Sequence, residues 1–180
     1  MDFGGGSGPE GDGPVRVRQA QVEDAREIAV MCALLWPESS AAEHGEEIEK
    51  VLVSGAYGTM PAAIFVSCDD DGRLTGFLEV SLRSHADGCD PSRPVGFVEG
   101  WFVREEFRKR GVGRALMISA EQWVAMQGCV EMASDTWMDE DLSQTAHRAL
   151  GFAGRERAGM ARPVPQHAIY RCRSKRLCPC

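Results

Sequence analysis

Two glycines set between a strand pattern and a helix pattern constrain the fold of this chain more than any other feature. The strand pattern is the largely apolar run Phe97–Val103, and the helix pattern runs from Gly111 to Met126. Gly111 and Gly113 open that helix, and a residue without a Cβ lets another group approach the backbone closely. Unpaired N–H groups and the helix dipole at such a start favour an anion. The pattern therefore predicts an α/β unit with an anion site where the strand passes into the helix.

The residues around the two glycines are basic. Arg108, Lys109 and Arg110 precede the first glycine, and Arg114 follows the second. A pyrophosphate is the anion that this arrangement favours. The chain contains no Walker A sequence, and its glycine spacing and missing ribose carboxylate do not fit a dinucleotide fingerprint. An ordinary turn before a basic helix start is the alternative that these residues leave open.

Hydrophobic periodicity predicts further strands and helices on both sides of this unit. Alternating or continuous apolar runs indicate strands, and apolar residues three and four positions apart indicate helices. Ser40 and Glu43 form a capping-box pattern before one helix, and Asp70-Asp71-Gly72 is a hairpin-turn pattern. The predicted strands are 15–20, 62–68, 74–82, 97–103, 130–134 and one around 169–170, and the predicted helices are 25–35, one after Ser40, 111–126 and 143–150. This order indicates an α/β domain with a mixed sheet.

Length and composition predict one domain. With 180 residues, 43% of them apolar, the chain can form a single core. We expect residues 1–14 to be a flexible leader, residues 15–172 the domain, and residues 173–180 a loose tail. No apolar run reaches the roughly 18–20 residues of a membrane span, and residues 1–14 lack the pattern of a signal peptide. We therefore expect no membrane association and a cytoplasmic protein.

Charge and reactive side chains limit the classes of function. The net charge of −7 argues against a nucleic-acid surface and suits a cationic substrate. The seven cysteines are odd in number and are expected mainly as reduced core thiols. No histidine or cysteine pattern supports a metal site, and no cysteine stands in a nucleophile-like turn with a histidine partner. Neither metal-dependent nor covalent catalysis is predicted.

The glycine loop and several other segments together resemble a known family. Arg108–Gly113 reads Arg-Lys-Arg-Gly-Val-Gly and resembles the loop of GNAT-type N-acetyltransferases whose backbone amides hold the pyrophosphate of coenzyme A. His147–Phe152 resembles the helix end and strand start that follow in that superfamily. Over roughly residues 15–157, the chain is most similar to aminoglycoside 6'-N-acetyltransferases. The segments that carry this resemblance are Leu35-Trp36-Pro37, Gly88-Cys89-Asp90, Phe97–Gly100, Gly128-Cys129, Glu131–Thr136 and Ser143-Gln144.

The resemblance implies a fold, a reaction and a co-substrate. The fold is a GNAT-type acyltransferase fold, with a central mixed, mostly antiparallel sheet that is flanked by helices and splayed between two parallel strands. The reaction is acetyl transfer from acetyl-CoA to the 6'-amino group of an aminoglycoside, and the resemblance also implies a homodimer. Acetylation of another amine (a polyamine or a protein N-terminus) and a non-catalytic coenzyme-A-binding role are the alternatives. Acetyl-CoA would contact the strand edge and the loop, namely Trp101, Phe102, Val103, Arg108, Lys109, Arg110, Gly111, Val112, Gly113 and Arg114.

Two carboxylates are the candidate catalytic residues. Glu99 interrupts an apolar strand, and alternation places it on the side of Phe97 and Trp101 unless a bulge redirects it. Asp135 closes the next predicted parallel strand, at the end where open α/β sheets bind ligands. With the resemblance, we expect Glu99 to be the base that deprotonates the amine, and Asp135 to hold neighbouring ammonium groups. The alternatives are an ion pair between Glu99 and an arginine such as Arg83, and a turn-capping role for Asp135.

Two further residues are candidates for substrate binding through the resemblance alone. Trp36 would form a wall against a sugar ring of the antibiotic, although a core aromatic after a helix is the ordinary role of such a residue. Glu156 would turn toward the substrate, and a solvated strand carboxylate is the alternative. The chain departs from the family in the loop before Gly88, where a substrate-facing tyrosine of the family has no counterpart and only His85 lies nearby.

Overall fold

The computed structural model describes residues 15–137, 141–155 and 167–172. The predicted leader 1–14 and tail 173–180 lie outside these residues. The strands are β1 (Arg16–Gln19), β2 (Ala56–Tyr57), β3 (Met60–Cys68), β4 (Leu74–Arg83), β5 (Val95–Val103), β6 (Met132–Trp137), β7 (Ala153–Arg155) and β8 (His167–Cys172). The helices are α1 (Ala25–Leu35), α2 (Ala41–Ser54), α3 (Val112–Met126) and α4 (Asp141–Ala149), with short 3₁₀ turns η1 (Val22–Asp24) and η2 (Glu105–Phe107).

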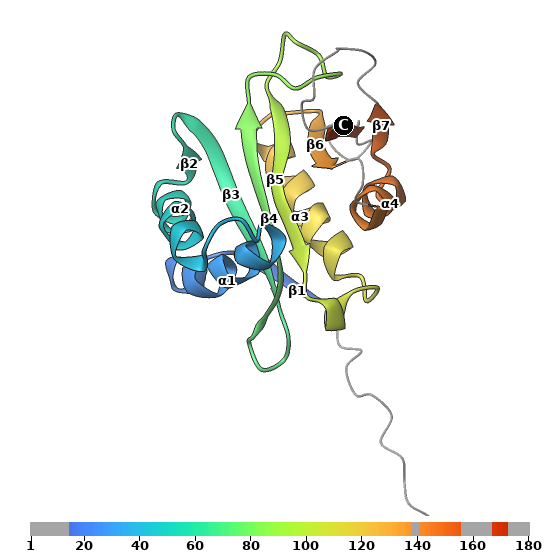
Figure 1. The fold of residues 1–180 in the computed structure, drawn as a ribbon. Helices are drawn as coiled ribbons and strands as arrows, with labels where there is room; N and C mark the ends of the chain where they lie inside the picture. The colour runs from blue at the N-terminus through green and yellow to red at the C-terminus, as the bar shows by residue number, and fades with distance from the viewer. Residues whose placement is uncertain (1–14, 138–140, 156–166, 173–180) are drawn as a thin grey trace, which may run out of the picture.

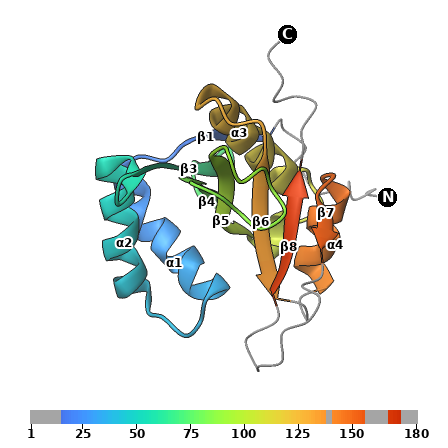
Figure 2. The ribbon, with the colours of Figure 1, turned by 90° about the horizontal axis from the view of Figure 1, so that it is seen from above.

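The strands form one mixed sheet in the order β1-β3-β4-β5-β6-β8-β7, with β2 paired to β3. Helices α1 and α2 lie side by side against one face of β3–β5, and α3 covers the opposite face (Figure 1; Figure 2). Each side has its own buried cluster. Phe77 and Ile64 pack toward α1 and α2, whereas Leu78 and Val80 pack toward α3. The alternation of β4 therefore supplies both cores.

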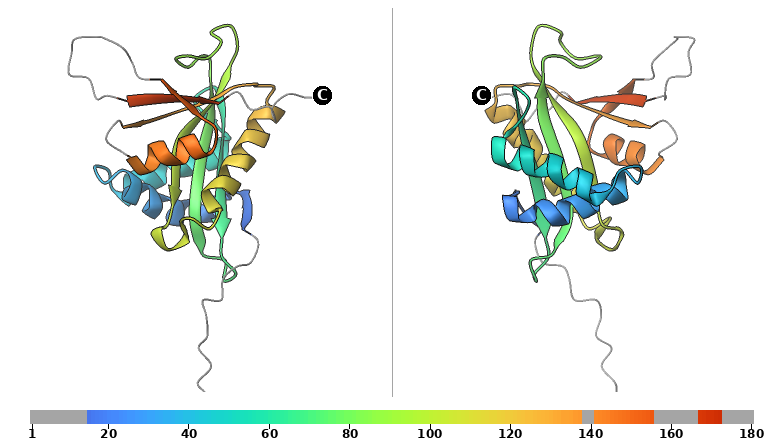
Figure 3. Two further views of the ribbon diagram at one scale, coloured as in Figure 1. Left: turned by 90° about the vertical axis from the view of Figure 1, so that its right-hand side faces the viewer. Right: turned by 60° about the vertical axis from the view of Figure 1, so that its left-hand side comes forward.

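The sheet opens between β5 and β6. These two strands pair in parallel only from Gly96 and Met132 to Val98 and Ser134, although both continue beyond these residues. Figure 3 shows β6 and β8 turning away from β3–β5. The expected splay between two parallel strands is thus present, as is the mostly antiparallel pairing of the other strands.

Local sequence signals determine how α1 passes into α2. Trp36 leaves the helical region directly before Pro37, with φ −128° and ψ 81°. Ser40 and Glu43 form the predicted capping box, in which the Ser40 N–H donates to Glu43 Oε2 at 2.8 Å. Helix α2 ends at Gly55 in the left-handed region. The connection keeps the Trp36 side chain beside the sheet.

The structure adds two short strands to the predicted order. β2 has two residues and β7 has three, so neither is long enough to give an alternation pattern in the sequence. β6 begins two residues later than predicted and runs to Trp137, past the predicted end at Ser134. As a result, Asp135 lies within the strand and does not close it.

Candidate active site

Helix α3 begins as an open anion site. Gly111 is its N-cap residue with φ 83°, and no side chain caps the helix. The first turn contains no acidic residue. No side chain of this turn therefore neutralises its free N–H groups or the positive end of the helix dipole. Lys109 also has a positive φ, 61°, which is uncommon for a residue with a side chain. The loop is therefore shaped to direct backbone amides toward an anion.

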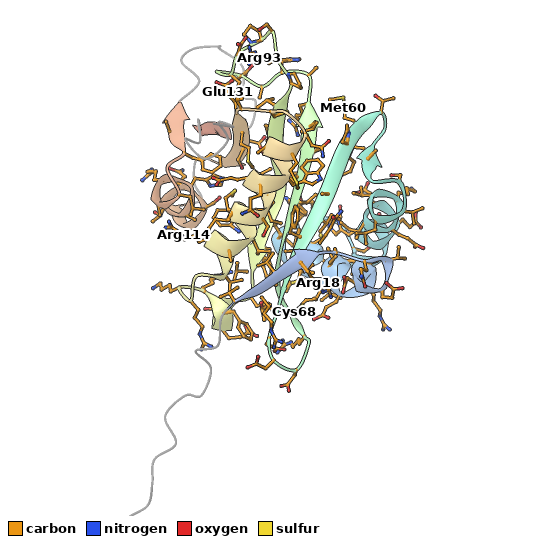
Figure 4. All side chains as sticks on the ribbon, turned by 180° about the vertical axis from the view of Figure 1, so that it is seen from behind. Arg18, Met60, Cys68, Arg93, Arg114 and Glu131 are labelled. Atoms are coloured by element: carbon orange, nitrogen blue, oxygen red, sulfur yellow. The ribbon has the colours of Figure 1, made fainter. Side chains whose placement is uncertain are left out.

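The side chains of the loop divide into solvent-facing and packed groups. Arg108, Lys109, Arg110 and Arg114 are exposed. Arg108 Nε donates to the Val103 carbonyl at 3.0 Å, and this hydrogen bond ties the loop to the end of β5. Arg114 lines a hollow between α3 and α4 (Figure 4). Val112, by contrast, is 5% exposed and belongs to the core, so only its backbone can reach a ligand.

The two glycines have different roles. A Cβ added to Gly111 would meet no atom within 4 Å, so the left-handed backbone is what requires glycine there. A Cβ added to Gly113 would lie 2.8 Å from Cζ2 of Trp101. The close approach expected at Gly113 is therefore made by the Trp101 indole, which seats α3 on β5.

The outer edge of β5 is open beyond Val98. Trp101, Phe102 and Val103 pair with β4 on one side. On the other side, no described strand pairs with them, because the register with β6 ends at Val98. Trp101 Nε1 is also buried without a hydrogen-bond partner among the described residues. An open edge with unpaired polar groups, leading to an uncapped helix, fits an elongated ligand such as the pantetheine and pyrophosphate of acetyl-CoA.

His147 closes the site from the side of α4. Its ring is 3% exposed and makes an edge contact with Trp101, with ring centroids 5.5 Å apart. Nδ1 lies 2.7 Å from the Ser143 carbonyl oxygen, and Nε2 lies 2.8 Å from Ser134 Oγ. Burial lowers the pKa of His147, so the ring is neutral at pH 7. His147 therefore packs between α4 and the strands β5 and β6.

A β-bulge in β5 separates the direction of Trp101 from that of Glu99. Glu79 of β4 pairs with Gly100, while the next residue, Val80, pairs with Val98. Glu99 is the extra residue of the bulge. Beyond it, the alternation of side chains between the two faces of the sheet is shifted by one residue. Glu99 consequently stays on the face of Phe97, and Trp101 moves to the face of α3. The bulge considered as an exception to simple alternation is present, but it redirects Trp101 and not Glu99.

Glu99 is held by three hydrogen bonds on that face. Arg83 Nε donates to Oε1 at 3.1 Å, and a second guanidinium nitrogen donates to Oε2 at 2.5 Å. Ser81 Oγ donates to Oε1 at 2.5 Å. The Arg83 guanidinium also lies 3.3 Å from the centroid of the Phe97 ring. The arginine partner named as the alternative for Glu99 therefore exists, and the carboxylate is still 23% exposed.

Asp135 and Glu99 occupy equivalent places on neighbouring strands. Val98 and Ser134 are the last paired residues of β5 and β6, and the two acids are the next residues along. Asp135 is exposed and stands two positions beyond Ala133, which packs in the same small cluster as Phe97. Both carboxylates thus belong to one face at the point where the strands part.

Of the remaining candidates, Trp36 reaches this face and Glu156 cannot be placed. The Trp36 indole covers Gly100, and its ring lies 5.8 Å from that of His44. It is half-buried, so it packs against the sheet and still presents a surface. Glu156 lies outside the described residues.

The sequence reasoning missed Glu79 and Tyr57. Glu79 lies on β4 and is 4% exposed, and the Tyr57 hydroxyl donates to its Oε1. Burial, with a smaller contribution from the charges of Glu99 and Glu47, raises the pKa of Glu79 to about 7. The signal was present in β4, where polar residues at 79, 81 and 83 alternate with Leu78, Val80 and Leu82. That period marks a polar face beside Glu99.

The described residues give no sign of a metal site. Among residues 15–137, 141–155 and 167–172, no three His, Cys, Asp or Glu side chains gather as ligands. The cysteines within these ranges, Cys32, Cys68, Cys89 and Cys129, are free thiols. No helix in the same part of the chain has the length and apolar content needed to cross a membrane.

Comparison with known proteins gives concordant results. The family described as acetyltransferase (GNAT) family matches residues 28–152. A protein of Klebsiella aerogenes named aminoglycoside N(6')-acetyltransferase type 1 is 40% identical over 76% of this chain and 88% of its own length. A protein of the same name from Stenotrophomonas maltophilia is 38% identical over 78% and 88% of the two chains.

Solved structures agree with this result. The structure of AAC(6')-Iy in complex with the bisubstrate analogue CoA-S-monomethyl-acetylneamine superimposes with a TM-score of 0.73. It is 34% identical in sequence, and the match covers 84% of this chain and 99% of that chain. A crystal structure of the 6'-N-acetyltransferase AAC(6')-Ih from Acinetobacter baumannii has a TM-score of 0.72 at 26% identity, over 84% and 99% of the two chains.

Proposed function

The chain belongs to the acetyltransferase (GNAT) family, and we propose that it transfers the acetyl group of acetyl-CoA to the 6'-amino group of an aminoglycoside. The observation that carries this proposal is the pair Glu99 and Asp135 at the point where β5 and β6 part. Two carboxylates on one face, next to an open strand edge, suit a substrate with several ammonium groups. The named relatives and the bisubstrate complex support the same substrate class.

Acetyl-CoA supplies the acetyl group as a thioester when it is bound. The N–H groups of Val112, Gly113 and Arg114 are placed to hold its pyrophosphate, with the exposed loop cations adding charge. The open edge at Trp101–Val103 is placed to accept the pantetheine through backbone hydrogen bonds. A backbone N–H directed at the thioester carbonyl is typically worth about 3 kcal/mol in the transition state.

The substrate ammonium groups would be held by the two carboxylates. Asp135 is exposed, so its side chain is accessible to a neighbouring ammonium. Glu99 offers the part of its carboxylate that Arg83 and Ser81 leave open. Trp36 would lie against a sugar ring, since its indole already covers this part of the sheet. Glu156 completes the proposed set through the family resemblance alone. In this assignment, the other ammonium groups of the substrate lie on one side of the reacting amine, and acetyl-CoA lies on the other side.

A cytoplasmic homodimer is the proposed state of the protein. The free thiols at Cys32, Cys68, Cys89 and Cys129 suit a reducing compartment. The homodimer rests on the resemblance to a family whose members often dimerise. Sedimentation equilibrium of the purified chain tests it, with a single species of monomer mass as the contrary result.

A thiol-release assay tests the proposed function. The full chain is incubated with acetyl-CoA and, in separate reactions, a kanamycin-type aminoglycoside, spermidine and a peptide with a free N-terminus. We expect release of coenzyme A with the aminoglycoside at a kcat/KM at least tenfold above that with either other amine. Faster turnover of spermidine or of the peptide would assign the enzyme to a different amine. Binding of acetyl-CoA without turnover of any amine would indicate a non-catalytic homologue.

A further inference from the structure

A buried carboxylate lies directly beside the proposed substrate face. Glu79 is the register partner of Gly100, next to the bulge at Glu99. It shares its face of β4 with Ser81 and Arg83, which bind Glu99. The roles proposed above for acetyl-CoA and substrate binding leave Glu79 unused. Burying a charged carboxylate at such a site costs free energy unless hydrogen bonds or an opposite charge compensate it.

The groups around Glu79 come from four elements. Cys32 faces it from α1, Glu47 from α2, Tyr57 from β2 and Glu99 from β5. The Tyr57 hydroxyl donates to Glu79 Oε1. No cation forms an ion pair with Glu79 among the described residues, and the Arg83 guanidinium on the same strand is engaged by Glu99. Within this part of the chain, the hydrogen bond from Tyr57 is the compensation that Glu79 has.

The two neighbouring carboxylates have contrasting environments. Both oxygens of Glu99 accept hydrogen bonds from Arg83 or Ser81, and its charge is compensated by the Arg83 guanidinium. Glu79 is desolvated, which favours its protonated form and raises its pKa to about 7. An ion-paired carboxylate is suited to binding, and a neighbouring desolvated carboxylate without an ion pair is suited to proton transfer.

Tyr57 connects the buried carboxylate to the surface. Its side chain is 38% exposed, whereas Glu79 is 4% exposed. Burial and the adjacent carboxylates raise the pKa of Tyr57 well above its usual range, so the hydroxyl keeps its proton at neutral pH. A protonated hydroxyl can receive one proton while it passes its own to a hydrogen-bonded acceptor. Tyr57 therefore has the position and the protonation state of a relay.

We propose that Glu79, through the hydroxyl of Tyr57, accepts the proton that the substrate ammonium loses, while Glu99 and Asp135 bind the ammonium groups. The inference rests on the proposed function. It moves the role of base from Glu99 to Glu79, and it assigns Tyr57 the contact with the reacting ammonium.

Deprotonation of the ammonium precedes acetyl transfer. An N–H bond of the ammonium breaks and its electron pair remains on nitrogen. The proton passes to the Tyr57 oxygen as the original hydroxyl proton passes to Glu79, which gives a neutral amine and a neutral carboxyl group. The new C–N bond then forms as the thioester C–S bond breaks, and the departing thiolate takes up the second proton that the nitrogen loses. Glu79 later returns its proton to water.

The test is the pH dependence of kcat in the full chain, measured with acetyl-CoA and a kanamycin-type aminoglycoside. For the unaltered chain we expect kcat to fall on the acid side with an apparent pKa of about 7. Glu79→Gln should lower kcat roughly 100-fold and remove that acid limb, with KM for the aminoglycoside changed less than about twofold. Glu79→Asp should restore part of kcat together with the acid limb.

Glu47→Gln is the matched control, because Glu47 is an exposed neighbour that also carries one negative charge but has no place in the relay. It should keep kcat at high pH and shift the acid limb slightly downward. Tyr57→Phe keeps the carboxylate and removes the relay, so kcat should fall at least about tenfold, with a smaller change in KM. If circular dichroism shows that Glu79→Gln does not fold, Tyr57→Phe decides.

The outcomes separate the two proposals. An unaltered chain that acetylates no aminoglycoside overturns the proposed function, and this inference with it. An active chain in which Glu79→Gln or Tyr57→Phe keeps both kcat and the acid limb overturns the proton-acceptor role alone. A loss confined to KM would also overturn it, because that result assigns Glu79 to binding.

Discussion

The indole of Trp36 lies so close to Gly100 that a Cβ added to the glycine would be 2.5 Å from Cη2. Gly100 is also the register partner of Glu79 and follows the bulged Glu99. The missing side chain at this position therefore lets an aromatic ring from the end of α1 cover the strand beside both carboxylates.

Gly100→Ala should displace Trp36 and disturb the substrate face. We expect a stability loss of about 1–3 kcal/mol from overpacking. In the Trp36→Phe background the smaller ring leaves room, and the same substitution should cost at least about 1 kcal/mol less. Urea unfolding of the four proteins measures this double-mutant cycle. Strict additivity would show that the two residues do not interact.

The coenzyme loop can be tested with an isosteric pair. Asn and Asp both tolerate the left-handed backbone of Gly111, and they differ by one negative charge. Gly111→Asp should weaken acetyl-CoA binding at least about tenfold, because the carboxylate repels the pyrophosphate. Gly111→Asn should bind nearly as well as the unaltered chain. Isothermal calorimetry compares them, and equal affinities for both variants would remove the loop from the binding site.

The charge of Asp135 can be separated from its shape. Asp135→Asn should raise KM for the aminoglycoside at least about tenfold, since a hydrogen bond to a charged group is worth roughly 1.5–3 kcal/mol. The Kd for acetyl-CoA should stay the same. Asp71→Asn is the control, because it removes the same charge in the turn between β3 and β4. Similar KM values in the two variants would mean that Asp135 does not bind the substrate.

Glu79 should reduce stability at high pH. Its pKa is raised to about 7 from an ordinary 4.5, so the folded state binds its proton more tightly than the unfolded state. The stabilisation that this protonation gives the folded state is complete below pH 4.5 and is lost as the pH rises through about 7. Glu79→Gln has no charge at any pH, so it should be more stable than the unaltered chain near pH 8, by on the order of 3 kcal/mol.

Urea unfolding at about pH 5 and about pH 8 measures this effect, and the gain should be small at the lower pH. Glu46→Gln on the exposed side of α2 serves as the control for a lost negative charge. A variant that is equally destabilised at both pH values would contradict the raised pKa of the buried group.

Local signals predicted most of the framework. Three signals act within a few residues, and the structure has all of them: the Ser40–Glu43 capping box, the helical break before Pro37, and the two glycines at the start of α3. The polar interruption of an apolar strand also identified Glu99. Its arginine partner was foreseen as an alternative, because a carboxylate inside such a strand requires compensation.

The missed features depend on packing between distant segments. Glu79 lies in an alternating strand and looks solvent-facing in the sequence, but α1, α2 and the short β2 cover it. Tyr57 belongs to a strand of two residues, too short for any period. The packing of Gly113 against Trp101 was also missed, because only the fold shows that the indole occupies the space next to this glycine.

A matched pair of substrates tests whether the protein transfers acetyl to the 6'-amino group. One aminoglycoside carries an amino group at the 6' carbon, and its counterpart carries a hydroxyl there and is otherwise identical. With acetyl-CoA and the full chain, we expect the first to gain the mass of one acetyl group, placed on the 6' nitrogen by NMR, and the second to remain unmodified. Acetylation of both compounds, or of a nitrogen elsewhere on the ring system, would contradict the account.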